Sequence, residues 1–329
     1  MTSSALSSPP RRTYLEIIKE CDNFPYPEIG NTSAYEEQVN SLWKFYLPED
    51  SRPHGFMLDS VVEKMPWTEN FRIVPSSKEI HLIQKTSPSW EGPCSDSIDA
   101  LLDNARAMEA FPKLGRKRDE KYSIVGAKFP IGIERSASSL FGIIGQGVHM
   151  TVYSRTKSGL KFWIPRRNLN KSTYPGMLDN AVAGGVAAGE TPFGCLVRES
   201  SEESGIPEQY VREHAKAGGT VTWFNISDLR AGGEIGLMNP GVLFVYDLEI
   251  SEDVVLKPVD GDIHAFHLMD VDEVKTSIEE GKFKPSSANV MIDFFVRHSI
   301  ITAEADKDYV DIVSRLHRRL GFPTSPQCY

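Results

Sequence analysis

The sequence predicts an α/β protein in which a mixed sheet lies between helical layers, preceded by a smaller α+β N-terminal domain. Three observations support this fold class: extended runs after residue 120, an acidic helix among them, and helices at the end of the chain. The extended runs are rich in β-branched and aromatic residues and read EKYSIVG, FGIIGQGVHMTVYS, LKFWIPRR, TVTWF and VLFVYDLEI. Strands that enclose one helix and precede others indicate a sheet covered by helices.

The last third of the chain is expected to add helices to this sheet. A short helix is predicted near residues 207–216, and a last strand, HAFHLMD, leads into a helix from about Val271. Two closing helices read SANVMIDFFVRHSI and DKDYVDIVSRLHRRL. The first of them is apolar almost all round, so it should be buried.

The smaller domain is placed at residues 13–118. Apolar spacing favours helices over residues 13–23, from Ser33 to about Tyr46, and over 53–67. FRIVPS and KEIHLIQ follow as two strands joined around Pro75 and Ser76. After a loop rich in Pro and Ser, a further helix is predicted, with an apolar side made of Ile98, Leu101, Leu102, Ala105 and Met108.

The charged run GRKRDEK, residues 115–121, favours a linker, so the larger domain is placed at residues 119–329. Residues 1–12 are expected to form a disordered tail, because Pro9 and Pro10 interrupt any amphipathic helix. Arg11 and Arg12 without nearby acids hint faintly at an organelle transit peptide.

Composition narrows the class of protein further. The 329 residues are 40% hydrophobic and 25% charged, which is typical of a soluble globular protein, and no run approaches the 18 apolar residues of a membrane span. A net charge of −9 argues against general nucleic-acid binding. The four scattered cysteines contain no C-x-x-C pair and favour a reduced intracellular compartment, so a cytoplasmic protein is expected. The sequence does not define the oligomeric state.

The stretch from Gly184 to Ile206, GGVAAGETPFGCLVRESSEESGI, carries the chemistry of the chain. Thr191 can cap a helix, Pro192 suits its first position and Gly205 suits its end, which predicts a helix from about Pro192 to Ser204.

Three carboxylates, Glu199, Glu202 and Glu203, are spaced to share one face of that helix. Like charges at this spacing repel each other, and a hard cation such as Mg²⁺ offsets them while bridging to phosphates. Glycines such as Gly184 and Gly185 let the backbone approach a metal ion or a phosphate. A solvated acidic face is the alternative for a bare E-x-x-E-E pattern.

The complete segment resembles the Nudix box, G-x5-E-x7-R-E-U-x-E-E-x-G-U, where U is a bulky aliphatic residue. Its fixed positions are all present, with Gly184 first, then Glu190, Arg198, Glu199, Glu202, Glu203 and Gly205. Ser200 departs from one U position, on the side of the helix opposite the carboxylates, and Ile206 fits the other.

This resemblance implies a Nudix sandwich and a hydrolase that uses Mg²⁺ or Mn²⁺. Glu199, Glu202 and Glu203 are the expected metal ligands, assisted by the Ala183 carbonyl, and water attacks a phosphorus. Arg198 and Glu190 are expected to orient the glutamates through an ion pair. A carboxylate from elsewhere is expected to complete the site, with Asp262 as the candidate and Glu234 as the alternative.

Basic residues just before the box are candidates for binding the substrate. Arg166 and Arg167 end a predicted strand and Lys171 follows in the next turn, and arginine binds phosphate through two parallel hydrogen bonds. As isolated residues they would be ordinary surface charges. Their position favours a diphosphate site, to which Gly184 and Gly185 contribute backbone.

The run KFWIPRRNLNKSTYPGMLDNAVAGGV is similar to one subgroup, the Nudix hydrolases joined or related to fungal thiamine pyrophosphokinases, with plant counterparts. FKPSSANVMIDFFVRH, YVDIVSRLHRRL and the N-terminal region look like the same subgroup. The resemblance implies hydrolysis of thiamine diphosphate and its oxidised or damaged forms, oxythiamine and oxothiamine diphosphate, to the monophosphate and phosphate. Candidates to line a pocket for the heterocycle are Tyr174, Trp223, Phe224, His149 and Gln146, although aromatic residues on strands are commonly core.

Two other functions remain open from the residues themselves. A Nudix pyrophosphatase acting on a nucleotide sugar or a dinucleotide would release a nucleoside monophosphate. A non-catalytic diphosphate-binding module would bind its ligand without turnover.

Overall fold

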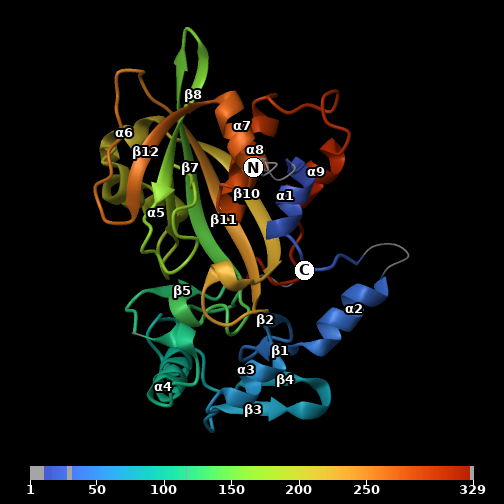
Figure 1. Ribbon diagram of the computed structural model, residues 1–329. Coiled ribbons are helices and arrows are strands. Elements are labelled where there is room, and N and C mark those ends of the chain that lie inside the picture. Colours follow the sequence, from blue (N-terminus) through green and yellow to red (C-terminus); the bar gives the residue numbers. More distant parts are fainter. Residues whose placement is uncertain (1–10, 28–31, 116, 327–329) are drawn as a thin grey trace, which may run out of the picture.

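The computed structural model describes residues 11–27, 32–115 and 117–326, and its centre is a mixed six-stranded sheet (Figure 1). Strand order is β10-β11-β7-β8-β12, and β9 pairs with β7 beside this path. β11 runs parallel to β7, whereas β7 pairs antiparallel with β8 and β9. The strands are β7 (Gly145–Thr156), β8 (Gly159–Arg167), β9 (Val182–Gly185), β10 (Lys216–Ile226), β11 (Met238–Glu249) and β12 (Ile263–Asp270).

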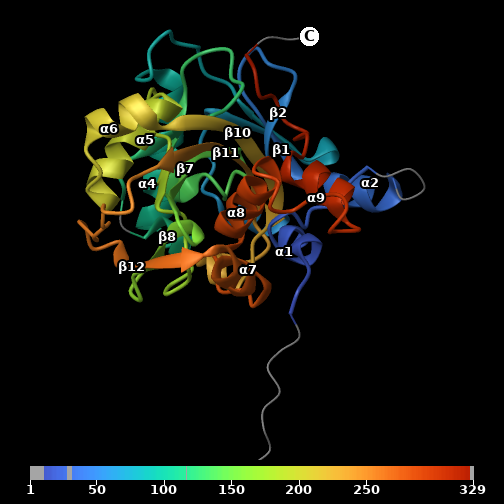
Figure 2. The same cartoon turned by 90° about the horizontal axis from the view of Figure 1, so that it is seen from above.

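Helices cover both faces of this sheet (Figures 1 and 2). One face packs on α1 (Tyr14–Cys21), α7 (Val271–Glu279), α8 (Pro285–Arg297) and α9 (Tyr309–Leu316). The other packs on α5 (Pro192–Glu199) and α6 (Glu208–His214). Alternation along β7 separates the two cores, since Val152 lies in the α5 core and Tyr153 in the α8 core. The predicted α/β/α sandwich is therefore confirmed.

Helix α8 is as buried as its sequence predicts. Every residue from Ser287 to Phe295 is buried, so this helix forms the middle of its layer. The predicted change from strand to helix at Val271 is also confirmed, because Asp270 caps α7 with a hydrogen bond from the Glu273 backbone.

The N-terminal region contains a smaller four-stranded sheet, ordered β2-β1-β4-β3, which lies below the main sheet in Figure 1. Its strands are β1 (Trp43–Tyr46), β2 (Pro53–Met57), β3 (Phe71–Val74) and β4 (Glu79–Leu82). The accompanying helices are α2 (Thr32–Ser41), α3 (Asp59–Lys64) and α4 (Pro93–Ala107). A hairpin of β5 (Lys121–Ser123) and β6 (Gly132–Glu134) follows. The predicted α+β character of this region is confirmed.

Two predicted helices are partly wrong. The helix expected to reach Tyr46 ends at Ser41, and β1 instead pairs with both β2 and β4. The helix expected over 53–67 is reduced to α3, because residues 53–57 form β2. Sheet partners supply hydrogen bonds that a short amphipathic pattern does not reveal. Met108, predicted on the apolar side of α4, follows the last residue of the helix and is 66% exposed.

The division of the chain at residue 118 stays a prediction, and the packing adds two facts. Helix α1 packs on α8 and α9, so this N-terminal helix shares the core of the main sandwich. Residues 124–143 contribute buried side chains to the core of the N-terminal sheet. Of the predicted tail, residues 1–10 lie outside the described part, while the Arg12 backbone donates a hydrogen bond to the Glu279 carbonyl over 3.1 Å. Within the described ranges no helix is both long and apolar enough to cross a bilayer.

Candidate active site

The acidic helix begins as its sequence predicts. Thr191 accepts a hydrogen bond from the Gly194 backbone over 3.1 Å, and Pro192 occupies the first turn of α5. The end of the helix differs from the prediction. Helix α5 stops at Glu199 and continues as a π-helical turn, η4 (Ser200–Ser204), before Gly205 closes it at φ +67°.

The three glutamates differ in burial. Glu202, in the π turn, lies outward with 54% of its side chain exposed. Glu199 is only 15% exposed. Ser200, the departure from the aliphatic pattern, is fully buried and donates to the Leu196 carbonyl over 2.6 Å. A small hydroxyl residue thus fits the packed side of the helix, as expected.

Glu199 lies directly against β9. A Cβ atom on Gly184 would stand 2.2 Å from the Glu199 carboxyl carbon, so only glycine leaves room for this side chain. Burial raises the pKa of Glu199 above its ordinary value, and the charge of Arg198 opposes that shift. The protein therefore holds a carboxylate where its charge is poorly solvated.

Glu203 contacts the neighbouring residue of the same strand. Its Oε2 accepts a hydrogen bond from the Ala183 backbone N–H over 2.9 Å. Burial, aided by the charges of Glu199, Asp179 and Asp260, raises the pKa of Glu203 well above its ordinary value, despite the hydrogen bond. Two crowded carboxylates with raised pKa values form a site that favours a cation.

Arg198 connects the remaining acids, and the predicted ion pair with Glu190 is present. Its Nε donates to Glu190 Oε1 over 3.0 Å, while Nη1 donates to Glu199 Oε1 over 2.8 Å and to Glu202 Oε2 over 3.0 Å. Burial alone would raise the pKa of Glu190, but hydrogen bonds from Arg198 and from the Ala187 backbone lower it. Arg198 therefore fixes the directions of three acids at once.

The donor chemistry of this cluster fits a hard divalent cation. As the side chains stand, no three His, Cys, Asp or Glu residues in the described ranges converge on one point suitable for a metal ion. The third carboxylate of this helix, Glu202, turns toward Arg198 and is hydrogen-bonded to it. Glu199 and Glu203 already lie side by side along β9, and a rotation of Glu202 away from Arg198 would add a third oxygen donor.

Two of the predicted substrate-binding cations are held by the protein itself. Arg167 donates to Asp179 over 2.8 Å and to the carbonyls of Thr173 and Tyr174. Lys171 forms an ion pair with Asp262. Arg166 is exposed at the end of β8, and its Nε donates to the Gly176 carbonyl over 3.0 Å.

The predicted extra carboxylates have other neighbours. Asp262 is 51% exposed and pairs with Lys171, whereas the charge of Asp260, two residues earlier, acts on Glu203. Glu234 lies in the loop between β10 and β11, and the charge of Lys113 acts there. Both Glu234 carboxylate oxygens are buried without a hydrogen-bond partner among the described residues.

The residues suggested for a heterocycle pocket belong to different surroundings. His149 is buried and hydrogen-bonds to Asn180 Oδ1 over 2.6 Å, and burial lowers its pKa to about 4. Phe224 is buried and stacks on Phe24 with ring centroids 3.9 Å apart. Trp223 packs over Gly241. The core alternative is therefore correct for His149 and Phe224.

Three residues missed in the sequence lie close to the box. The Tyr122 hydroxyl, from β5, occupies the space beside Gly185, 2.0 Å from where a Cβ would stand. The Arg135 guanidinium lies over the Tyr122 ring, 5.6 Å from its centroid. Lys284, just before α8, has its Nζ 3.9 Å from Asp179. Because they are far from the box in the sequence, no local sequence pattern indicates that they lie near it.

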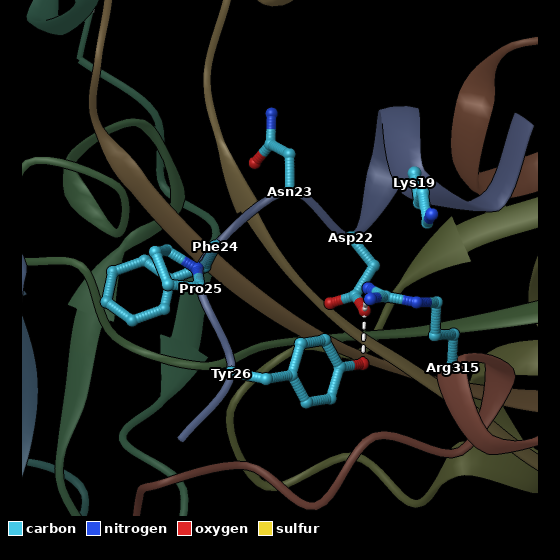
Figure 3. Close-up of a pocket in the computed structure, with 7 residues that line it drawn as sticks. All are labelled: Lys19, Asp22, Asn23, Phe24, Pro25, Tyr26 and Arg315. Atoms are coloured by element: carbon cyan, nitrogen blue, oxygen red, sulfur yellow. Dashed lines mark hydrogen bonds and ion pairs between the residues drawn. The ribbon is translucent and has the colours of Figure 1, made fainter. Parts of the chain in front are cut away.

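A separate pocket of about 350 Å³ lies between the end of α1, the following segment and α9 (Figure 3). Its lining includes Asp22, which accepts a hydrogen bond from the Tyr26 hydroxyl and forms an ion pair with Arg318 over 2.9 Å. None of the residues of the acidic box lines this pocket. Asp22 also pairs with Arg315 over 3.5 Å, and these ion pairs tie the C-terminal segment to the end of α1.

The fold and the comparisons together define a class: an α/β enzyme that hydrolyses diphosphates. Residues 145–294 match the model of the NUDIX domain. The uncharacterized protein YJR142W of Saccharomyces cerevisiae is 32% identical over 326 residues, covering 95% of this chain and 92% of that protein.

Two Arabidopsis thaliana proteins are also similar. Nudix hydrolase 20, chloroplastic, is 36% identical and covers 70% of this chain; Nudix hydrolase 24, chloroplastic, is 38% identical and covers 67%. The chain spans 65% and 60% of their lengths, respectively. The chain therefore contains a Nudix domain over residues 145–294 and is similar to Nudix hydrolases.

Proposed function

We propose that this protein is a metal-dependent hydrolase of thiamine diphosphate and of its oxidised or damaged analogues, oxythiamine and oxothiamine diphosphate. The products are the monophosphate and inorganic phosphate. The observation that carries the hydrolase part is the pair Glu199 and Glu203, held against β9 with raised pKa values. A divalent cation neutralises the charge of two crowded carboxylates, so this pair favours cation binding.

Mg²⁺ or Mn²⁺ is the proposed cofactor, held by Glu199, Glu203 and a rotated Glu202, with the Ala183 carbonyl as a further oxygen. When bound, the cation supplies neutralisation of phosphate charge and activation of water. Arg198 and Glu190 keep the acids in place through the ion pairs described above. The charge of Asp260 acts on Glu203, whereas the expected Asp262 pairs with Lys171. We therefore include Asp260 as a contributing carboxylate.

Support for a thiamine-type substrate comes from the similarity of residues 161–186 and of the last two helices to the thiamine-pyrophosphokinase-related subgroup. The likeness to the yeast relative covers the N-terminal region as well as the Nudix domain. A damaged cofactor keeps its diphosphate, so removal of one phosphate prevents it from occupying apo-enzymes. Arg166 and the backbone at Gly184 and Gly185 remain proposed contacts for the phosphates.

The deciding experiment measures Mg²⁺-dependent turnover over a panel of thiamine, oxythiamine, oxothiamine and nucleotide diphosphates, with each product identified by chromatography. Inorganic phosphate and a thiamine-type monophosphate are the expected products. Release of a nucleoside monophosphate from a nucleotide sugar or a dinucleotide, with no thiamine diphosphate turnover, would replace this proposal by the alternative activity. Saturable binding without turnover under Mg²⁺ and Mn²⁺ would indicate a diphosphate-binding module.

We also propose the cytoplasm as the site of action, from the scattered cysteines. Two plant relatives carry the name chloroplastic, which supports testing organelle import as well. A fluorescent fusion at the C-terminus, followed with compartment markers, distinguishes the two locations.

A further inference from the structure

Two cations from outside the acidic box share its electrostatic surroundings. Arg135 begins η3 (Arg135–Ala137), directly after β6, and Lys284 immediately precedes α8. The charge of Arg135 acts on Glu199, and the charge of Glu203 acts on Lys284. The contacts that position them are the packing of Arg135 on Tyr122, whose hydroxyl lies at Gly185, and the 3.9 Å separation of Lys284 Nζ from Asp179.

Arg135 is positioned but not enclosed. Its Nη1 donates to Glu120 over 2.9 Å, and 43% of its side chain is exposed. The guanidinium lies over the Tyr122 ring, which favours the cation through the ring's negative face. Arginine has five N–H donors, so one bond to Glu120 leaves this group able to bind a phosphate.

Tyr122 contacts both Arg135 and the Nudix domain. The Tyr122 hydroxyl fills the space above Gly185, and the adjacent Lys121 carbonyl accepts a hydrogen bond from the Ala188 backbone over 2.8 Å. Figure 1 shows β5 between α4 and the main sheet. The hairpin of β5 and β6 is thus docked on the glycine-rich strand, one residue beyond the glycine that makes room for Glu199.

Lys284 follows the acidic box in the sequence, whereas Arg135 precedes it. The charge of Glu203 acts on Lys284. Its Nζ lies 3.9 Å from Asp179, beyond hydrogen-bond distance, while Arg167 binds that carboxylate over 2.8 Å. The Ser287 hydroxyl and the Asn180 backbone also donate to Asp179. Lys284 is therefore one of several cationic and hydrogen-bonding partners of Asp179, and its ammonium, 22% exposed, has N–H donors left for an anion.

We infer that Arg135 and Lys284 bind the phosphate oxygens of the substrate across the acidic cluster, so that a residue outside the Nudix domain completes the diphosphate site. This inference rests on the proposed diphosphate hydrolysis. It differs from the sequence expectation, which placed the phosphate contacts on Arg166, Arg167 and Lys171. Arg135 precedes the matched range 145–294, so a Nudix domain cut at residue 145 lacks this contact.

The test uses the full chain and a non-hydrolysable probe, methylenediphosphonate, titrated by calorimetry with Mg²⁺ and again with EDTA. Arg135→Ala is expected to weaken binding about 10- to 100-fold, the effect of losing a charge-assisted hydrogen bond. Arg135→Lys should fall between, because it keeps the charge but loses the planar fork. Lys284→Met, which preserves the aliphatic stem, should also weaken binding. The matched control is Arg155→Ala, an exposed arginine paired with Glu249 at the far end of β7.

The outcomes separate this inference from the proposed function. Wild-type affinity in both Arg135→Ala and Lys284→Met, or no binding of the probe to the wild type, overturns the inference. If thiamine diphosphate is hydrolysed equally by wild type and both variants, the inference fails while the proposed function stands. If the variants lose the probe and the wild type hydrolyses no thiamine-type substrate, the phosphate contacts stand and the substrate assignment falls.

Discussion

Gly184→Ala tests whether the placement of Glu199 controls activity. The new Cβ would stand 2.2 Å from the Glu199 Cδ and 2.3 Å from its Cγ. Ordinary carbon contacts lie at about 3.5 Å or more, so the carboxylate must move by about 1 Å. A displacement of that size at a reacting centre costs on the order of 10²-fold in rate, which is the expected fall in kcat/KM.

The stability of the same variant should change little. The clashing atoms belong to the far end of the Glu199 side chain, which can rotate away, and replacing glycine by alanine stiffens the unfolded chain. A net change within about 1 kcal/mol is expected in urea denaturation. Gly145→Ala is the control, because its Cβ would meet nothing nearer than the Pro240 carbonyl oxygen at 4.0 Å.

The assay is initial-rate phosphate release with saturating Mg²⁺, alongside the denaturation curve of each variant. Equal kcat/KM for Gly184→Ala, Gly145→Ala and the wild type would refute the reasoning, since Glu199 would then be dispensable at its present position. A loss of activity accompanied by a large loss of stability would also contradict it, because the effect would come from misfolding.

Three further changes have expected outcomes. Glu202→Gln should keep the melting temperature, because the side chain is 54% exposed, and lose most Mg²⁺-dependent phosphate release. Unchanged turnover would exclude Glu202 as a metal ligand. A raised folded-state pKa of Glu203 means that its contribution to stability is present below its ordinary pKa of 4.5 and is lost as the pH rises through the folded value. Without metal, Glu203→Gln should therefore melt higher than wild type at neutral pH and equally at pH 4, and a constant difference across pH contradicts this. Asp22→Asn leaves the buried Arg318 without its ion-pair partner, which should cost about 3 to 5 kcal/mol of unfolding free energy in denaturant titration without raising KM. An unchanged unfolding free energy, or a rise in KM whose free energy exceeds the loss of stability, would contradict a structural role for Asp22.

Local signals in the sequence were sufficient for the boundaries of several elements. Thr191, Pro192 and Gly205 act through hydrogen bonds and backbone angles within a few residues, so their roles are readable before folding. Asp270 caps α7 for the same reason. By contrast, residues 43–46 and 53–57 became strands because each found a partner strand, which the local pattern does not contain.

The charges near the site illustrate the same limit. Arg167 is one of the predicted phosphate contacts, yet in the fold it is bound to the buried Asp179. Arg135 lies in a run without a phosphate motif, yet it packs on Tyr122, whose hydroxyl lies at Gly185 of the box. Which cation a carboxylate binds depends on distance and burial, and both are set by the tertiary structure.

The sequence by itself determined the order of the carboxylates, the start of their helix and the presence of a Nudix domain, because these depend on residue types at short spacing. The tertiary structure decided that the last turn is π-helical, that Glu202 turns toward Arg198, and that Arg135 packs on Tyr122 next to Gly185. Those features arise from contacts between segments far apart in the chain, which short-range propensities do not specify.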